Sequence, residues 1–162
     1  MRARWLAAVS SILIVLTCVG ARLPAAQQAG GDEEAIRRLI AAHAAASHQA
    51  DLRGLVDVYH PDADVRFSDG TVLRGRAEIE NSYRESLSSN PREVTHDHPP
   101  ETVHIRFLRP DVAFVDVESV SGGGTDRAGI RVPVSRTPLF VVFTKEQGRW
   151  GVADQRSGVP LK

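Results

Sequence analysis

Apolar residues recur at helical spacing in three segments of the chain. In the first segment Ile36, Leu39 and Ile40 lie on one helical face, and His43 continues the same stripe. Acidic residues just before this stripe favour a helix N-terminus, because they complement the positive end of the helix dipole. The pattern predicts three amphipathic helices, over residues 30–49, 52–59 and 76–88.

Short apolar runs separated by turn sequences fill the rest of the chain. Two of them flank Ser68-Asp69-Gly70, which is typical of a tight hairpin turn. Four longer strands are expected, over residues 102–108, 112–120, 137–144 and 149–156. This order of elements predicts a single α+β domain, in which a cone-shaped, curved antiparallel sheet wraps around the three helices.

One of these runs also predicts an assembly. Residues 139–143 are apolar at every position, so both faces of the expected strand should be buried. The helices of such a cone cover only the concave face. A second copy of the sheet is the simplest cover for the convex face, and we therefore expect a homodimer that forms through the sheet.

The N-terminal residues have the pattern of a secretory signal. Arg2 and Arg4 precede an apolar run over residues 5–19, and small residues follow at 23–27. The run is shorter than the roughly twenty residues that a membrane-spanning helix needs, so cleavage is favoured over permanent anchoring. We predict a signal peptide at residues 1–26.

The mature domain, residues 27–162, is therefore expected in the periplasm or outside the cell. A lipid anchor on Cys18 is the alternative, although Thr17 fits the corresponding cleavage signal poorly. Removal of the signal leaves 17 basic and 20 acidic side chains. This mildly acidic balance disfavours nucleic acid and membrane surfaces as partners. The mature domain would also contain no cysteine, and hence no thiol chemistry.

Five stretches, in this order and at these distances, resemble the SnoaL-like branch of the nuclear transport factor 2-like superfamily. They are QADL at 49–52, YHPDADV at 59–65, LRGRAEI at 73–79, VHIRFLRPDVA at 103–113 and GRWGV at 148–152. The resemblance implies a cone-shaped domain and looks closest to small SgcJ/EcaC-type bacterial proteins. The superfamily includes isomerases, cyclases, dehydratases, epoxide hydrolases and ligand-binding proteins, so the fold does not select a function. No dinucleotide-binding glycine motif is present, and no cofactor is expected.

The resemblance extends to the ketosteroid isomerases, which use a tyrosine and two aspartates. When the chain is matched to them around Asp51, the tyrosine falls on His43 and the aspartates fall near Phe67 and Leu139. Both carboxylates are thus absent, although Asp69 is two residues from the first. Isomerase chemistry of that type is not expected.

Three side chains are candidates for chemistry in the cone cavity. His43 lies on the inward stripe of the first helix, where it is either a cavity residue or a hydrogen-bonded core histidine. In the last strand, alternation places Asp154 and Arg156 on the same face as Trp150. If that face is inward, the two charges form either an acid–base and anchoring pair or a structural ion pair. Four aromatic residues are expected to form substrate-binding walls: Tyr59, Phe67, Tyr83 and Phe114.

Three of the six histidines lie within nine residues. His96 and His98 share strand parity and are spaced to bind one metal ion, with Glu101 or His104 as a third ligand. Two prolines directly after His98 interrupt regular strand pairing. We therefore interpret the segment as an exposed connector and expect no metal site.

Two functions follow from these patterns. The first is an exported protein that binds a small, mostly apolar molecule in the cone cavity. The alternative is an acid–base enzyme of the isomerase, dehydratase, cyclase or hydrolase type that uses His43 with Asp154 and Arg156 in the same cavity. A third possibility, a protein-interaction domain, is supported only by the strand that is apolar on both faces.

Overall fold

The computed structural model describes residues 25–89, 95–125 and 129–159; most of the predicted signal peptide, including Cys18, lies outside them. The helices in these segments are α1 (Ala25–Gln49), α2 (Leu52–Val56), α3 (Gly75–Ser89) and the 3₁₀ turn η1 (Pro100–Thr102). The strands are β1 (Tyr59–Arg66), β2 (Val72–Arg74), β3 (Thr95–Asp97), β4 (His104–Arg109), β5 (Val112–Gly122), β6 (Ser135–Glu146) and β7 (Arg149–Ser157). No helix of the described segments is long and apolar enough to cross a membrane.

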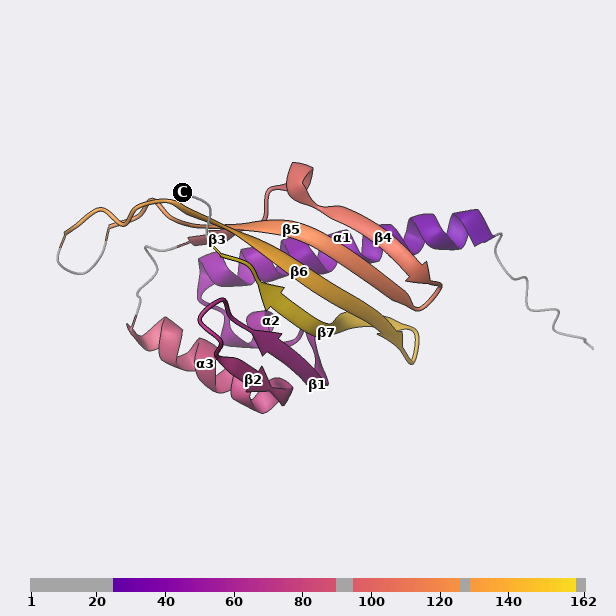
Figure 1. The fold of residues 1–162 in the computed structure, drawn as a ribbon, viewed down its shortest axis with the longest axis horizontal. Coiled ribbons are helices and arrows are strands. Elements are labelled where there is room, and N and C mark those ends of the chain that lie inside the picture. Colours follow the sequence, from indigo (N-terminus) through magenta and orange to yellow (C-terminus); the bar gives the residue numbers. More distant parts are fainter. Residues whose placement is uncertain (1–24, 90–94, 126–128, 160–162) are drawn as a thin grey trace, which may run out of the picture.

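The strands form one curved sheet in the order β2-β1-β7-β6-β5-β3, and β4 also pairs with β5. Figure 1 shows α1 running behind the central strands and α3 lying beside β1 and β2. This arrangement is the α+β fold that the sequence predicts. One detail differs, because β1 and β7 pair in parallel. Parallel neighbours need a long connection, and most of the domain separates these two strands.

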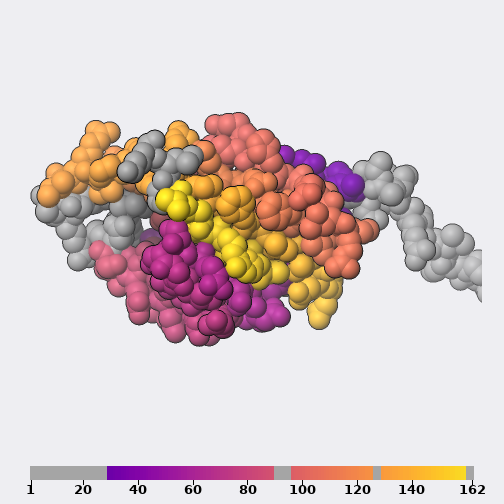
Figure 2. Space-filling view, in the orientation of Figure 1, coloured from indigo at the N-terminus to yellow at the C-terminus, as the bar shows by residue number. Residues whose placement is uncertain are grey.

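Each long helix buries an apolar stripe against the concave face of the sheet. Ile36 of α1 and Ile79 of α3 are almost fully buried and belong to one core with Val115, Val141 and Phe143 of the sheet. Figure 2 shows the convex face, where the described part of the chain places no helix over β5, β6 and β7. The side chains that could meet inside the cone therefore come from the helices and from one face of the strands.

The second helix is shorter than the sequence pattern predicts. It ends at Val56, and Tyr59 is the first residue of β1 instead of the end of the helix. The Val58 carbonyl already accepts a hydrogen bond from the Val152 N–H at 2.8 Å, so the chain has joined β7 at this point. Pro61 could not have continued a helix in any case.

Two other elements differ from the predicted pattern. α1 begins at Ala25 instead of near residue 30, because Gly30 and Gly31 weaken a helix without terminating it. β3 is not predicted at all. It is only three residues long and polar, and it exists because it pairs with the end of β5.

The apolar run in β6 is buried on one face only. Leu139, Val141 and Phe143 are buried on the concave side, whereas Phe140 is 40% exposed on the convex side. The Phe140 ring stacks on Phe114 of β5, with 6.5 Å between ring centroids. A single chain thus leaves Phe140 partly uncovered, and the homodimer that would bury the convex face remains a prediction.

Candidate functional site

A cavity of about 920 Å³ lies between the concave face of the sheet, α1 and α3. Its apolar walls include Leu39, Ile40, Leu55, Val117, Leu139 and Phe143. Among the described residues that line it, none is Asp, Glu, Lys or Arg. The polar groups at its surface are imidazoles, hydroxyls and one side-chain amide. A cavity of this size and character suits a small organic molecule.

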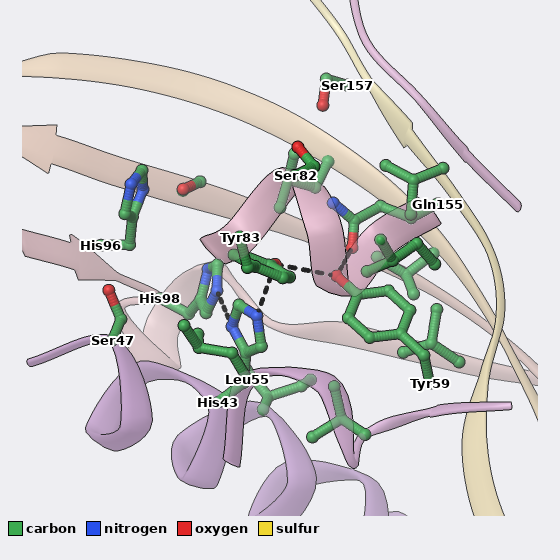
Figure 3. A pocket seen from close by; sticks show the side chains of 18 of the residues that line it. His43, Ser47, Leu55, Tyr59, Ser82, Tyr83, His96, His98, Gln155 and Ser157 are labelled. Atoms are coloured by element: carbon green, nitrogen blue, oxygen red, sulfur yellow. Dashed lines mark hydrogen bonds between the residues drawn. The ribbon is translucent and has the colours of Figure 1, made fainter. Parts of the chain in front are cut away.

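Four side chains from four elements meet across this cavity. His43 of α1 has its Nε2 atom 2.9 Å from Tyr83 Oη of α3. The Tyr83 hydroxyl lies 3.1 Å from the hydroxyl of Tyr59 at the start of β1, and the Tyr59 hydroxyl lies 3.0 Å from Gln155 Oε1 of β7. Figure 3 shows that these contacts form one continuous chain from α1 to β7. The apolar stripe of α1 correctly predicts that His43 points inward, where it contacts the Tyr83 hydroxyl at the cavity surface.

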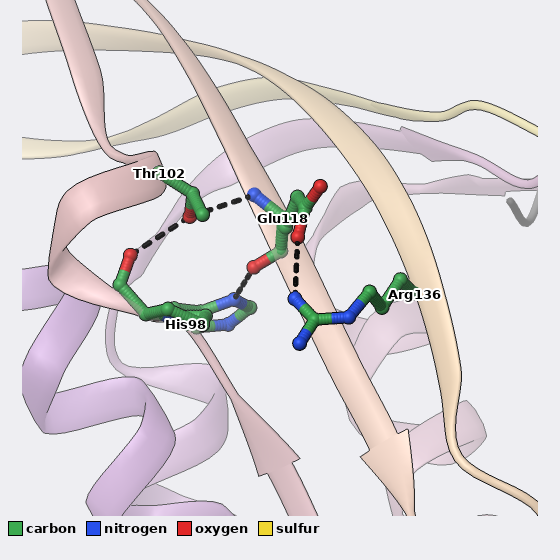
Figure 4. Close-up of polar contacts among 5 residues, drawn as sticks. His98, Thr102, Glu118 and Arg136 are labelled. Carbon is green, nitrogen blue, oxygen red and sulfur yellow. Dashed lines mark hydrogen bonds and ion pairs between the residues drawn. The ribbon is translucent and has the colours of Figure 1, made fainter.

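His98 extends this chain toward β5. Its Nε2 lies 3.4 Å from His43 Nδ1, and its Nδ1 lies 3.2 Å from the backbone carbonyl of Glu118. The turn η1 holds this position, because Thr102 Oγ1 donates to the carbonyl of Pro99 and accepts from the Glu118 N–H (Figure 4). The carboxylate of the same glutamate points the other way, toward a β6 arginine.

The expectation of an exposed connector is wrong for His98, whereas Asp97, Pro100 and Glu101 are exposed. His96 and His98 both line the cavity, with His98 half-buried and His96 exposed at the rim. Pro99 and Pro100 do not lead into an irregular loop. They begin the 3₁₀ turn, where the fixed φ of proline is favourable. His104 is exposed on β4 and does not join the other two. Within the described segments, no three His, Cys, Asp or Glu side chains are arranged to hold a metal ion.

The direction of these hydrogen bonds follows from the last acceptor of the network, the backbone carbonyl of Glu118. The Glu118 carbonyl can only accept, so His98 Nδ1 carries a proton. A neutral His98 then accepts at Nε2 from His43 Nδ1–H. The remaining nitrogen of His43 accepts from the Tyr83 hydroxyl. Tyr59 has a single proton, which goes either to Tyr83 or to the neighbouring amide.

The side chains in this hydrogen-bond network are uncharged at neutral pH. Burial, together with the fields of His98 and His96, lowers the pKa of His43 to about 3. Burial also lowers the pKa of His98, although its bond to the carbonyl opposes the shift. Burial raises the pKa of Tyr83, and it raises the pKa of Tyr59 well above its ordinary value. The rings border the cavity, but protein surrounds their other sides, and this loss of water disfavours every charged form.

Residues 30–156 match the family model of the SnoaL-like domain. The chain belongs to this family. The finer SgcJ/EcaC-type grouping remains a prediction, and no curated protein matches the chain.

Solved structures similar to this SnoaL-like domain show the same fold. An uncharacterised protein with a cystatin-like fold from Caulobacter vibrioides is 19% identical, with 82% of this chain and 92% of that chain covered and a TM-score of 0.70. A type 2 hexachlorocyclohexane dehydrochlorinase, LinA, is 13% identical, with coverage of 85% and 93% and a TM-score of 0.72. A ketosteroid isomerase-like protein from Erwinia carotovora atroseptica is 18% identical, with coverage of 76% and 92% and a TM-score of 0.63. At these identities the likeness establishes the fold alone.

Asp154 and Arg156 of the SnoaL-like domain do not face the cavity. Arg156 Nε and Nη2 each lie 2.7 Å from an oxygen of the Asp154 carboxylate, and the pair sits on the convex face. Gln155 and Ser157 line the cavity in their place. The prediction that the acid and the guanidinium point inward with His43 is therefore wrong.

A β-bulge in β7 causes this difference. Phe143 of β6 pairs with Val152, and the preceding Val142 pairs with Asp154, so Ala153 is an extra residue in β7. Alternation of side chains reverses at such a position, because two residues of one strand oppose one of the other. No residue type in this stretch marks the bulge, which is why sequence alternation missed Gln155 and Ser157.

The four predicted aromatic contacts divide between the two faces. Tyr59, Tyr83 and Phe67 border the cavity, with Phe67 at its rim and 37% exposed. Their role as ligand contacts remains a prediction. Phe114 instead lies on the convex face, where the guanidinium of Arg106 sits 5.7 Å from its ring centroid. Regular alternation in β5 buries the residues on either side of Phe114, so this ring cannot reach the cavity.

Proposed function

We propose that this SnoaL-like domain binds a small, mostly apolar and uncharged molecule in its cone cavity. The observation that carries the proposal is the lining: a wall of aliphatic side chains, one chain of neutral hydrogen-bonding groups, and no charged residue among those described. A charged ligand would lose its hydration there without gaining a partner of opposite charge. An apolar ligand with one or two polar atoms would meet both kinds of surface.

The protonation state of His43 favours binding over catalysis. A general base works best when its pKa is close to the pH at which it operates. Protonating a group whose pKa is about 3 costs about 5 kcal/mol at neutral pH. His43 is thus better suited to accept a hydrogen bond from Tyr83 than to remove a proton.

Native mass spectrometry of protein purified from its own host tests the proposal. We expect a co-purified molecule, or binding of an added neutral probe such as 2-naphthol, at one site per chain. Ser82→Trp, at a position of α3 that lines the cavity, should abolish binding. Ser88→Trp on the exposed side of the same helix is the matched control. Equal binding by both variants would place the ligand elsewhere and contradict the proposal.

Acid–base catalysis is the second candidate, and one specific observation favours it. The hydrogen bonds give the Tyr83 hydroxyl a base at His43 Nε2, so a proton could pass between Tyr83 and a bound molecule with His43 as its partner. Two similar structures carry the names of a dehydrochlorinase and an isomerase-like protein. Asp154 and Arg156 have no part in this version, because they face outward.

Deuterium exchange separates the two candidates. Protein with its co-purified molecule is transferred to heavy water, and the released molecule is weighed. Catalysis predicts deuterium at a carbon atom, with loss of exchange in Tyr83→Phe and His43→Gln. Retention of the molecule without any label leaves binding as the function.

We also propose export, with a mature protein that lacks residues 1–26. The order of basic, apolar and small residues supports this. N-terminal sequencing of protein from the periplasm or medium should find a start near residue 27. An intact Met1 would contradict export, and a lipid on Cys18 would contradict cleavage after residue 26.

We propose in addition a homodimer through the convex face. Phe140 supports it, since a large apolar ring that is 40% exposed gains from burial. Light scattering at micromolar concentration should give twice the chain mass. Phe140→Lys should give a monomer, and Val159→Lys, at another exposed apolar residue, should not. A monomeric wild-type protein would refute the dimer.

A further inference from the structure

The polar lining of the cavity is concentrated at one end. On the sheet, Ser119 of β5 pairs with Thr137 of β6, and one step further out His96 of β3 pairs with Ser121 of β5. All four side chains line the cavity. In the other direction along β5 the next cavity residue is Val117, and apolar side chains continue from there. The concave face of β5 thus changes from aliphatic to hydroxyl within two residues.

The two long helices repeat this division. On α1 the cavity side runs from Ile40 and His43 to Ser47, one turn further on. On α3 it runs from the buried Ile79 to Ser82 and then Ser86. Figure 3 shows Ser47 and His96 on the side of the His43–Tyr83 pair away from Tyr59, with Ser82 beyond Tyr83. The helices and the sheet therefore place their hydroxyl groups at the same end of the cavity.

These hydroxyls differ from other serine hydroxyls of the domain. Ser88 and Ser89, on α3 but outside the cavity, each donate to the carbonyl of Glu85. The hydroxyls of Ser82 and Ser86 have no hydrogen-bond partner among the described residues. Donors and acceptors at this end are thus available to a bound molecule.

Exposure alone does not explain the composition of this end. Charged residues make up 25% of the chain, and a solvated opening would accommodate them as well as it accommodates serine. Among the described residues that line the cavity, charged side chains are absent at both ends. Hydroxyl groups suit a ligand that both donates and accepts, because each can do either.

We propose that the ligand is an uncharged molecule with an apolar body and a hydroxyl-rich end of the kind that a sugar carries. The apolar body lies against the aliphatic walls, and the hydroxyl-rich end lies against a hydroxyl subsite. This subsite consists of Ser47, Ser82, Ser119, Ser121 and Thr137. The proposal rests on the binding function proposed above and adds to it the chemical class of the ligand.

Three probes that share a naphthalene body test the proposal by calorimetric titration of the mature protein. They are 2-naphthyl β-D-glucopyranoside, 2-naphthol and 2-naphthoate. Two new neutral hydrogen bonds correspond to about tenfold in affinity, so we expect the glucoside to bind about tenfold more tightly than naphthol. Naphthoate should bind most weakly, because its charge has no partner.

The outcomes separate the two proposals. If naphthol binds and the glucoside binds no more tightly, the hydroxyl subsite is refuted while cavity binding stands. If naphthoate binds most tightly, the uncharged class is refuted. If none of the probes binds, the binding function and the subsite both fall.

Variants locate the effect within the cavity. Ser119→Ala combined with Thr137→Val removes two facing hydroxyls with little change in shape, and it should bring the ratio of glucoside to naphthol affinity from about ten to near one. Ser89→Ala, outside the cavity, should leave the ratio at its wild-type value. Circular dichroism checks folding, and Ser121→Ala serves if the double variant does not fold. A tenfold ratio that survives in the folded cavity variant overturns the proposal.

Discussion

The neutral state of His43 makes the stability of the domain depend on pH in a defined direction. Unfolded His43 has a pKa of about 6.5, whereas burial lowers the folded value to about 3. Between these values the unfolded chain binds a proton that the folded chain does not, so the free energy of unfolding falls as the pH falls. From pH 7 to pH 4.5 this one side chain removes about 2 to 3 kcal/mol.

His43→Gln tests this reasoning, because glutamine can still accept from Tyr83 but does not titrate. Urea unfolding at pH 7.0 and pH 4.5 gives the free energy of unfolding of each protein. We expect the wild type to lose about 2 to 3 kcal/mol more than His43→Gln over this range. His104→Gln, an exposed position on β4, should follow the wild type. Equal losses in the wild type and His43→Gln would show that the folded protein does not hold His43 neutral.

Three further substitutions should lower the free energy of unfolding, measured by urea at pH 7. Asp32→Asn should cost about 2 to 3 kcal/mol, because the buried carboxylate accepts from Lys145 at 2.6 Å and from an indole N–H; an unchanged midpoint would contradict this. Gly151→Ala should cost about 1 to 3 kcal/mol, since its Cβ would lie 2.8 Å from the ring of His60. Thr102→Val should cost about 1 kcal/mol by removing the hydroxyl that joins η1 to β5, and no loss would mean that η1 holds without it.

Much of the architecture could be predicted from the sequence, because helical periodicity reports which face of a helix is buried. The stripe through Ile36 and Ile40 placed His43 on the inside of the cone, where the structure has it. The turn Ser68-Asp69-Gly70 likewise gave the correct hairpin, with Val65 opposite Leu73. Both are local patterns, set by residues close to one another in the sequence.

The features that the sequence did not reveal depend on contacts between distant segments. β3 is a strand only because the end of β5 accepts it as a neighbour, and His98 faces the cavity only because Thr102 joins η1 to Glu118. The bulge at Ala153 is similar, since it is a property of the pairing between β6 and β7 and not of either strand alone. Pattern analysis treats each segment separately and therefore assigned the wrong parity to Asp154.

Because of the bulge at Ala153, the charge of the cavity lining depends on one extra residue in β7. Deleting Ala153 would restore regular alternation. The side chains of β7 that follow the bulge would then move to the opposite face of the sheet. A carboxylate and a guanidinium would then enter a cavity whose described lining is neutral, while an amide and a hydroxyl would move to the outside. Within one fold, a one-residue insertion or deletion at this position is thus a direct route between a pocket for neutral molecules and a pocket equipped for ionic chemistry.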